Sequence, residues 1–326
     1  MSVQTLPAFR LLRPASVAEV LASLAANTGA RLVAGGTDLL PNLRRGLERP
    51  PVLVDLGAVP GFDELTVAVD GLVLGAGVTL ARLASETALA AAYPALGEAA
   101  RAAAGPGHRS AATLGGNLCL DTRCVYYNQS EWWRSSNGFC LKRGGSTCHV
   151  APQGSRCHAA FSGDLAPALI AYGASIELQS ARGTRRIPLE QAYRDDGAAH
   201  LTIERDELLV RVHLNTPAAG TRSGYRKARV RGAMDFPLAG VAASLRLEGG
   251  VVAALRVALT GTNSHPLLLQ GTEALLGRAL DDDALSALGK LVHKQVSPMR
   301  STVTAANHRR LVGAVTAQRL LRELAA

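Results

Sequence analysis

The hydrophobic positions of the first sixty residues switch between the period of a helix and that of short strands. Ser16 and Glu19 have the spacing of a capping box, and the apolar residues that follow recur every three or four positions: Val17, Val20, Leu21 and Leu24. We therefore predict a helix that ends near Asn27–Gly29. Short apolar runs at 31–34 and 52–56 predict two strands around it, so residues 1–60 are expected to form a small α/β unit.

Alternation with period two dominates the next part of the chain. Residues 64–81 read as a hairpin that turns at Asp70-Gly71, and the alanine-rich stretch 80–104 predicts a helix. Strand-like sequence resumes after residue 162 and continues to about residue 216. Residues 61–216 are therefore expected to form a second subdomain.

The final third predicts two long strands followed by helices. The strands are expected at 238–247 and 251–260, and the helices at about 271–296 and 303–325. The small-residue segment Pro217–Gly224 is the expected boundary, so the last domain would span 217–326. The pattern as a whole predicts an α+β protein.

Composition narrows the possible environments and partners. The 326 residues are 48% hydrophobic, with neither an apolar run long enough for a transmembrane helix nor an N-terminal signal peptide. A cytoplasmic location is therefore expected, where thiols stay free or bind metals. The net charge of +9 comes from scattered basic residues with few aromatics between them. This arrangement is typical of a solvated basic surface or of one that docks an acidic partner, and it predicts neither a nucleic-acid nor a membrane partner.

Two glycine pairs follow apolar segments in the manner of anion-binding turns. Gly35-Gly36 precedes Thr37, and Gly115-Gly116 follows Thr113. Glycines let backbone N–H groups approach an anion without a Cβ in the way, although each pair could also be a plain strand-to-helix turn. The two pairs together suggest one diphosphate held from two sides. A third glycine-rich segment, 74–77, lacks the last glycine of a dinucleotide fingerprint and is interpreted as a strand end.

The order of these motifs resembles a known family. Segments 34–41, 109–117 and 164–167, followed by Leu208-Leu209 and Lys227, are similar to the FAD-binding subunits of the xanthine dehydrogenase family of molybdenum hydroxylases. The resemblance covers essentially the whole chain. It implies a two-subdomain FAD-binding fold with a C-terminal α+β domain, and an oxidoreductase subunit that is not a complete enzyme alone.

The same resemblance implies which residues contact FAD. The first turn would hold the diphosphate, the second would reach it from the other subdomain, and Asp164, Leu209 and Lys227 would lie towards the flavin ring. The full set of expected FAD contacts is Leu32, Val33, Ala34, Gly35, Gly36, Thr37, Asp38, Leu39, Thr113, Gly115, Gly116, Asn117, Asp164, Leu209 and Lys227.

All five cysteines fall within residues 119–157, in a segment that also holds both tryptophans. Four of them, Cys124, Cys140, Cys148 and Cys157, are separated by 15, 7 and 8 residues, without the short knuckles typical of structural zinc sites. Irregular spacing suits a [4Fe–4S] cluster, with zinc or free thiols as the alternatives. Cys119 is interpreted as a buried small residue, and the aromatic residues are expected to shield the cluster from water.

These four cysteines lie in an apparent insertion at about residues 121–160, between two expected FAD-binding elements. The insertion resembles one branch of the family, the flavin subunits of 4-hydroxybenzoyl-CoA reductases. That resemblance implies a [4Fe–4S] cluster beside FAD, a molybdopterin-containing large subunit, a [2Fe–2S] small subunit and ferredoxin as the electron donor, in a dimer of heterotrimers. The alternatives are a family member with a different aromatic or N-heterocyclic substrate, or a zinc-stabilised protein that binds nucleic acid.

Overall fold

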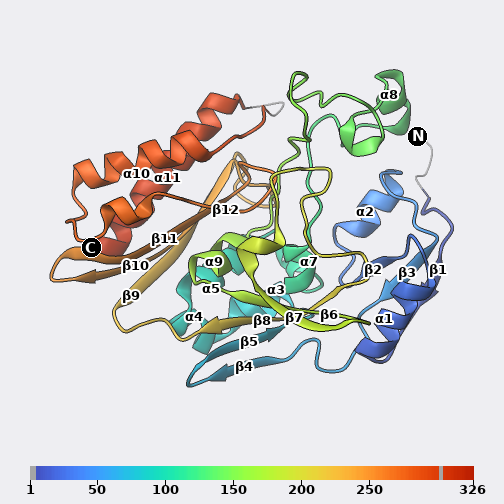
Figure 1. The fold of residues 1–326 in the computed structure, drawn as a ribbon, viewed down its shortest axis with the longest axis horizontal. Coiled ribbons are helices and arrows are strands. Elements are labelled where there is room, and N and C mark those ends of the chain that lie inside the picture. The colour runs from blue at the N-terminus through green and yellow to red at the C-terminus, as the bar shows by residue number, and fades with distance from the viewer. Residues whose placement is uncertain (1–4, 301–303) are drawn as a thin grey trace.

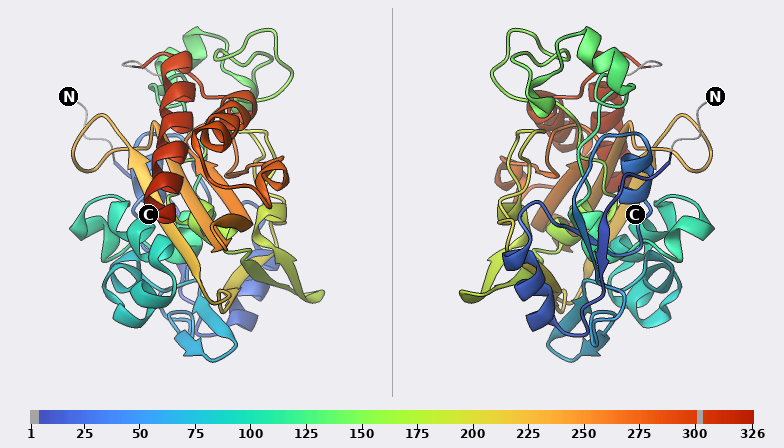
Figure 2. Two further views of the ribbon diagram at one scale, coloured as in Figure 1. Left: turned by 90° about the vertical axis from the view of Figure 1, so that its left-hand side faces the viewer. Right: turned by 90° about the vertical axis from the view of Figure 1, so that its right-hand side faces the viewer.

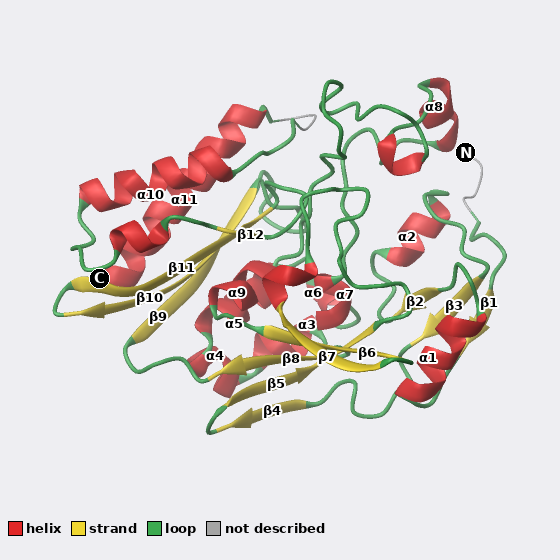
Figure 3. Ribbon diagram, viewed as in Figure 1, coloured by secondary structure: helices red, strands yellow, loops and turns green. Residues whose placement is uncertain are grey.

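Three separate β-sheets organise the molecule, each with its own helices (Figure 1). The computed structural model describes residues 5–300 and 304–326. Helices lie beside each of the three sheets, as Figure 3 shows, and the predicted fold with both helices and sheets is confirmed. The three sheets are built from residues 10–55, 65–215 and 221–268. The proposed boundaries at 60 and 216 fall between these ranges and stay a prediction.

The first sheet is parallel, with the order β1-β3-β2. Its strands are β1 (Arg10–Leu12), β2 (Arg31–Val33) and β3 (Val52–Asp55), flanked by α1 (Val17–Ala26) and α2 (Leu39–Arg44). Ser16 caps α1 by accepting a hydrogen bond from the backbone N–H of Glu19, as predicted. The strand β1 was missed, because three residues are too few for a periodic signal.

The second sheet is antiparallel, with the order β4-β5-β8-β6-β7. Its strands are β4 (Leu65–Ala68), β5 (Gly71–Gly75), β6 (Ser175–Ser180), β7 (Gly183–Pro188) and β8 (Leu208–Asn215). The predicted hairpin is present. The single helix predicted over 80–104 is wrong, because the chain forms three short helices there: α3 (Leu80–Ser85), α4 (Thr87–Ala92) and α5 (Pro94–Ala102). Proline at 94 begins a new helix, since its ring restricts the preceding Tyr93 to a non-helical conformation.

The third sheet is antiparallel with the order β12-β11-β10-β9, and two long helices cover one of its faces (Figure 1). It contains β9 (Thr221–Ala228), β10 (Ala239–Glu248), β11 (Val251–Thr260) and β12 (Leu267–Leu268). The covering helices are α10 (Asp282–Gln295) and α11 (Ala306–Ala325). The helix predicted over 271–296 is shorter than expected, because residues 272–275 form a separate 3-10 turn. Of the helix predicted over 303–325, residue 303 lies outside the described residues. The strand β9 was missed because the segment was read as a boundary.

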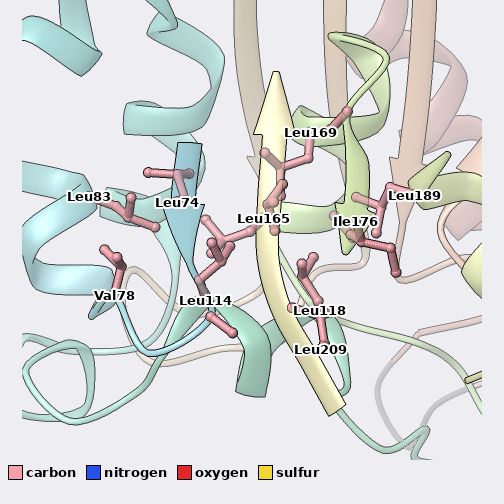
Figure 4. Close-up of a cluster of buried hydrophobic side chains, with 14 of the residues drawn as sticks. Leu74, Val78, Leu83, Leu114, Leu118, Leu165, Leu169, Ile176, Leu189 and Leu209 are labelled. Carbon is pink, nitrogen blue, oxygen red and sulfur yellow. The ribbon is translucent and has the colours of Figure 1, made fainter. Parts of the chain in front are cut away.

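A fully buried helix joins the second and third sheets. Every residue of α9 (Leu165–Ala171) is buried, and the helix packs against β10 and β11. Figure 4 shows Leu165 of this helix among Leu74, Leu114 and Leu209, which come from β5, α7 (Leu114–Leu118) and β8. The packing therefore fixes α7 and β8, which carry the second glycine turn and Leu209.

The cysteine-rich insertion leaves the body of the molecule and returns to it at one point. Arg123 and Ala160 exchange two backbone hydrogen bonds of 2.9 and 2.8 Å, which close its base. The insertion, with α8 (Glu131–Ser136) and the 3-10 turn η1 (Leu141–Arg143), projects beyond the sheets (Figure 2). The remaining short helices are α6 (Pro106–Arg109), η2 (Leu189–Ala192) and η3 (Thr272–Leu275). None of the helices in the described ranges combines the length and hydropathy that a membrane crossing requires.

Candidate functional site

A cavity of about 230 Å³ lies between the first sheet and the second, where the two glycine turns meet. Thirteen of the fifteen expected FAD contacts line it. Twelve of them lie in or beside the two turns: Leu32, Val33, Ala34, Gly35, Gly36, Thr37, Asp38, Leu39, Thr113, Gly115, Gly116 and Asn117. Leu209 of β8 lines it as well. The structure therefore brings together, at one cavity, residues that are distant in the sequence.

The first turn requires glycine at both positions, for different reasons. A Cβ on Gly35 would lie 1.8 Å from the carbonyl oxygen of Ala111, so the turn and the chain that leads into α7 pack backbone to backbone. Gly36 has φ of +68°, a left-handed conformation that side chains with a Cβ rarely adopt. The turn thus presents bare backbone to the cavity, which is what an approaching diphosphate needs.

The second turn is held in the same way. A Cβ on Gly115 would lie 2.9 Å from that of Ala76, and the N–H of Gly115 donates to the Ala76 carbonyl at 2.7 Å. Thr113 caps α7 by accepting from the N–H of Gly116 at 3.2 Å. The side-chain oxygen of Asn117 accepts from the N–H of Leu165, which ties this turn to α9. Segment 74–77, interpreted above as a strand end, is indeed the end of β5, and its Ala76 supports the second turn.

Several residues of the cavity wall were not expected from the sequence. Asp121 and Leu120 follow the second turn closely, and Glu207 and Leu208 precede Leu209, so proximity to known motifs was an available signal for these four. The same signal was available for Arg31, Ala112 and Cys119, which flank expected contacts. It was not available for the remaining residues, which reach the cavity through the fold: Glu48, Leu56, Phe62, Ala76 and Ile203.

Asp164 and Lys227 do not line this cavity, although both were expected to contact FAD. They form a buried ion pair instead, with Lys227 Nζ 3.0 Å from Asp164 Oδ2 and side chains only 4% and 7% exposed. The hydroxyl of Tyr225 donates to the other carboxylate oxygen at 2.6 Å. Burial raises the pKa of Asp164, and the neighbouring Lys227 and Tyr225 oppose that rise. This cluster joins α9 to β9, so in this structure it links the second and third sheets.

The four expected metal ligands converge on a second, much smaller cavity inside the insertion. Cys124, Cys140, Cys148 and Cys157 all line it, together with Tyr126, Tyr127, Leu141, Lys142, His149 and Val150. All four thiols are buried. Cys119 instead lies at the larger cavity beside the two glycine turns, which is called the flavin-side cavity below. The cavity volume is about 10 Å³, so the thiols close around little free space. The structure therefore separates the four from Cys119, as the sequence analysis did.

Two of these sulfurs already accept backbone hydrogen bonds. The N–H of Tyr127 donates to Cys124 Sγ at 3.3 Å, and that of Ala159 donates to Cys157 Sγ at 3.4 Å. Burial raises the pKa of Cys157 to about 12 and raises that of Cys124 as well, which favours the neutral thiol at both positions. Hydrogen bonds to sulfur are among the features that tune iron–sulfur clusters.

The insertion differs from the expected metal site in two respects. In the described part of the chain, no group of three or more His, Cys, Asp or Glu side chains is arranged to hold a single metal ion. His149 lines the cysteine cavity, but its Nε2 lies 2.8 Å from the carbonyl oxygen of Phe139. Trp132 is 75% exposed on α8, so the expectation that the aromatic residues shield the cavity is wrong for this one. Tyr127, which is buried, does cover it.

Charged side chains connect the two cavities. Arg123, at the base of the insertion, pairs with Asp38 at 3.1 Å beside the first glycine turn. Lys142 lines the cysteine cavity and pairs with Asp121, which lines the flavin-side cavity, at 2.6 Å. Tyr127 lies beneath both cations, 5.4 Å from the Arg123 guanidinium and 4.9 Å from Lys142 Nζ. The wall between the cavities is therefore built from ion pairs as well as backbone.

Comparisons with known proteins agree with this geometry. Residues 7–217 match the family of FAD-binding domains in molybdopterin dehydrogenases, and residues 223–324 match the C-terminal domain of CO dehydrogenase flavoproteins. The xanthine dehydrogenase FAD-binding subunit of Escherichia coli O157:H7 is 31% identical over 89% of this chain and 86% of its own length. The nicotine 6-hydroxylase medium subunit of Paenarthrobacter nicotinovorans is 26% identical over 93% of each chain.

A solved structure shows the same fold over nearly the whole chain. It is a carbon monoxide dehydrogenase from Hydrogenophaga pseudoflava, which superposes with a TM-score of 0.81 and 25% sequence identity and covers 98% of this chain and 97% of that one. The glycine-lined cavity, the two matching domains and these relatives lead to one conclusion: the chain belongs to the FAD-binding oxidoreductase subunits of the xanthine dehydrogenase and CO dehydrogenase family of molybdenum hydroxylases.

Proposed function

We propose that this chain is the electron-transfer subunit of a 4-hydroxybenzoyl-CoA reductase, with a [4Fe–4S] cluster held by Cys124, Cys140, Cys148 and Cys157 beside its FAD. The observation that carries the proposal is the convergence of these four buried cysteines on one cavity within an insertion of the FAD-binding domain. Three of the relatives are named for FAD and none of those reported is named for an iron–sulfur cluster, so the cluster rests on the cysteines of this chain.

The donor set fits an iron–sulfur cluster better than a zinc ion. Structural zinc sites typically use short cysteine knuckles, whereas the four cysteines of this chain are separated by 15, 7 and 8 residues. A cluster of four irons keeps its four thiolates farther apart, and the N–H donors of Tyr127 and Ala159 are already directed at two sulfurs. The small cavity must widen as the cluster is built, which the loops between the cysteines can accommodate because they contain no long helix or strand.

The flavin-side cavity fits FAD. A Cβ at Gly35, Gly36 or Gly115 would press against Ala111, Leu40 or Ala76, so glycine at these positions keeps both turns tightly packed with their backbone along the cavity where a diphosphate would bind. FAD supplies chemistry that can proceed in one-electron or two-electron steps. The residues that would hold FAD and those that would hold the cluster lie on opposite sides of one wall, to which the Arg123–Asp38 ion pair contributes.

The proposed reaction needs partner subunits, because the two cavities described above are assigned to FAD and to the cluster, which leaves neither for an aromatic thioester. We propose a molybdopterin-containing large subunit, a [2Fe–2S] small subunit and reduced ferredoxin as the donor, in a dimer of heterotrimers. Two electrons from two reduced ferredoxins and two protons remove one phenolic hydroxyl as water. The basic character of the chain, +9 overall, favours docking of an acidic donor.

A second candidate is a dehydrogenase of the same family with an N-heterocyclic substrate. It is favoured by the relatives, which include subunits of enzymes named for nicotine and caffeine. The solved structures include a quinoline 2-oxidoreductase from Pseudomonas putida 86 at 24% identity, which supports the fold alone. The cysteine cavity has no role in this second candidate.

The experiment is reconstitution of the three subunits under anaerobic conditions. The complex should dehydroxylate 4-hydroxybenzoyl-CoA with reduced ferredoxin, whereas the isolated chain should take up electrons from ferredoxin without turnover. If the complex contains more iron than the small subunit's clusters require but hydroxylates an N-heterocycle, the proposed substrate is wrong and the second candidate takes its place. A complex whose FAD subunit lacks iron would contradict the proposal itself.

A further inference from the structure

Lys142 lies in the wall between the two cavities and is one of the least exposed cations of the insertion. Its side chain is 7% exposed and lines the cysteine cavity. Its ion-pair partner, Asp121, is 20% exposed and lines the flavin-side cavity. The pair therefore forms a dipole across the wall, with its positive end at the thiols and its negative end at the flavin side.

The ammonium group is held in place by a complete set of partners. Besides Asp121 Oδ1 at 2.6 Å, it donates to the carbonyl oxygens of Thr122 at 3.0 Å and Gly197 at 2.8 Å, and it contacts the Thr122 hydroxyl. An ammonium has three protons to donate, so none is left without an acceptor. The ring of Tyr127 closes the remaining side at 4.9 Å. This lysine thus places its charge at a defined point, unlike a flexible surface lysine.

A fixed charge in a poorly solvated wall acts strongly on nearby redox groups. Coulomb energies grow as the effective dielectric constant falls, and water is largely absent around this side chain. A cation beside a cluster stabilises the form that carries one more electron, which raises the reduction potential. An anion beside a flavin opposes the added electron, which lowers the potential of the flavin.

We propose that the Lys142–Asp121 pair adjusts the two redox groups in opposite directions: Lys142 raises the reduction potential of the cluster at the four cysteines, and Asp121 lowers that of FAD. This inference rests on the proposed function, because it requires both groups in one chain. It identifies Lys142 as a residue that acts on the cluster through its charge, without being a ligand.

The test is a redox titration of the assembled complex, with the cluster followed by electron paramagnetic resonance and FAD by visible absorbance. Lys142→Met removes the charge and keeps a side chain of similar length. It should shift the cluster equilibrium at least tenfold towards the oxidised form, which is a fall of about 59 mV for a one-electron couple. Asp121→Asn should raise the potential of FAD by more than it raises that of the cluster.

Two control variants separate charge from structure. Lys142→Arg keeps the charge and should leave the cluster potential near the wild-type value. Arg143→Met removes the same charge from the neighbouring residue, whose side chain is 32% exposed and does not line the cysteine cavity. It should therefore shift the cluster potential much less than Lys142→Met does.

The possible results distinguish this inference from the proposed function. Wild-type potentials in Lys142→Met, with full iron, sulfide and flavin, would overturn the inference and leave the proposed function intact. Absence of iron at the four cysteines of the wild-type complex would overturn both. Should Lys142→Met lose the cluster, an unchanged FAD potential in Asp121→Asn would be enough to overturn the inference.

Discussion

The guanidinium of Arg123 lies 3.1 Å from the carboxylate of Asp38, and this ion pair joins the base of the cysteine insertion to the first glycine turn. The Arg123 side chain is 11% exposed, and its backbone pairs with Ala160 where the insertion returns. Asp38 also accepts a hydrogen bond from Asn42 of α2 at 2.8 Å. Together with the Lys142–Asp121 pair, this ion pair ties the insertion to the cavity formed by the glycine turns.

This connection predicts that Arg123→Met weakens FAD binding although Arg123 does not line the cavity. Loss of one partner of a partly buried ion pair costs about 1–3 kcal/mol, and we expect FAD affinity to fall roughly tenfold. Quenching of flavin fluorescence on binding to the apoprotein measures the affinity. Arg143→Met, in the exposed part of the insertion, is the matched control. Equal affinity in the Arg123 variant and the control would show that the ion pair does not position the turn.

The first glycine turn should tolerate no side chain. Gly35→Ala would place a Cβ 1.8 Å from the Ala111 carbonyl oxygen, and Gly36→Val would put a β-branched residue at φ +68°, a strain of about 1–3 kcal/mol. Both variants should be folded and flavin-poor, as measured by the ratio of flavin to protein absorbance. Gly107→Ala is the control, because a Cβ there meets nothing within 4 Å. Full flavin content in Gly35→Ala would place the diphosphate elsewhere.

The four cysteines should be necessary for iron, and the fifth should not. We expect about four irons and four acid-labile sulfides per chain, and a serine at Cys124, Cys140, Cys148 or Cys157 should remove or degrade the cluster. Cys119→Ser should keep the full content, since Cys119 lies at the other cavity. Iron and sulfide analysis of anaerobically purified protein provides the measurement. Stoichiometric zinc without iron would refute the assignment.

His200 should make the protein less stable in acid. Burial, assisted by nearby Lys142, lowers its pKa from 6.5 to about 4 in the folded state, while Asp121 opposes this effect. The unfolded chain therefore binds a proton at His200 more readily than the folded chain does. The free energy of unfolding keeps its full value above pH 6.5 and decreases as the pH falls towards 4. The loss amounts to at most about 3 kcal/mol.

Urea unfolding of wild type and His200→Gln over this pH range tests the prediction. The variant should show a flatter dependence of the unfolding free energy on pH, because glutamine does not titrate. His108→Gln, at an exposed position, controls for the removal of a histidine. Parallel pH dependences in wild type and His200→Gln would contradict it.

Local signals in the chain were sufficient for much of the fold. The capping box at Ser16, the hairpin turn at Asp70-Gly71 and the helical period of α11 depend on neighbours within a few positions, and the structure contains all three elements. The strand β9 had no such signal. Its Gly224 packs against α11, far along the chain, and a Cβ there would lie 2.9 Å from the side chain of Leu320. Short or glycine-containing strands are defined by their partners rather than by their own pattern.

By itself, the sequence determined which residue types were available for chemistry: two glycine pairs after apolar segments, and four cysteines confined to one insertion. Only the tertiary structure decided how they meet. It brought the glycine pairs to one cavity and the cysteines to another, paired Asp164 with Lys227 away from the flavin side, and placed Lys142 opposite Asp121 across the wall. The physical reason is that glycine and cysteine patterns reflect local backbone and ligand requirements, whereas ion pairs depend on distances between segments that only packing brings together.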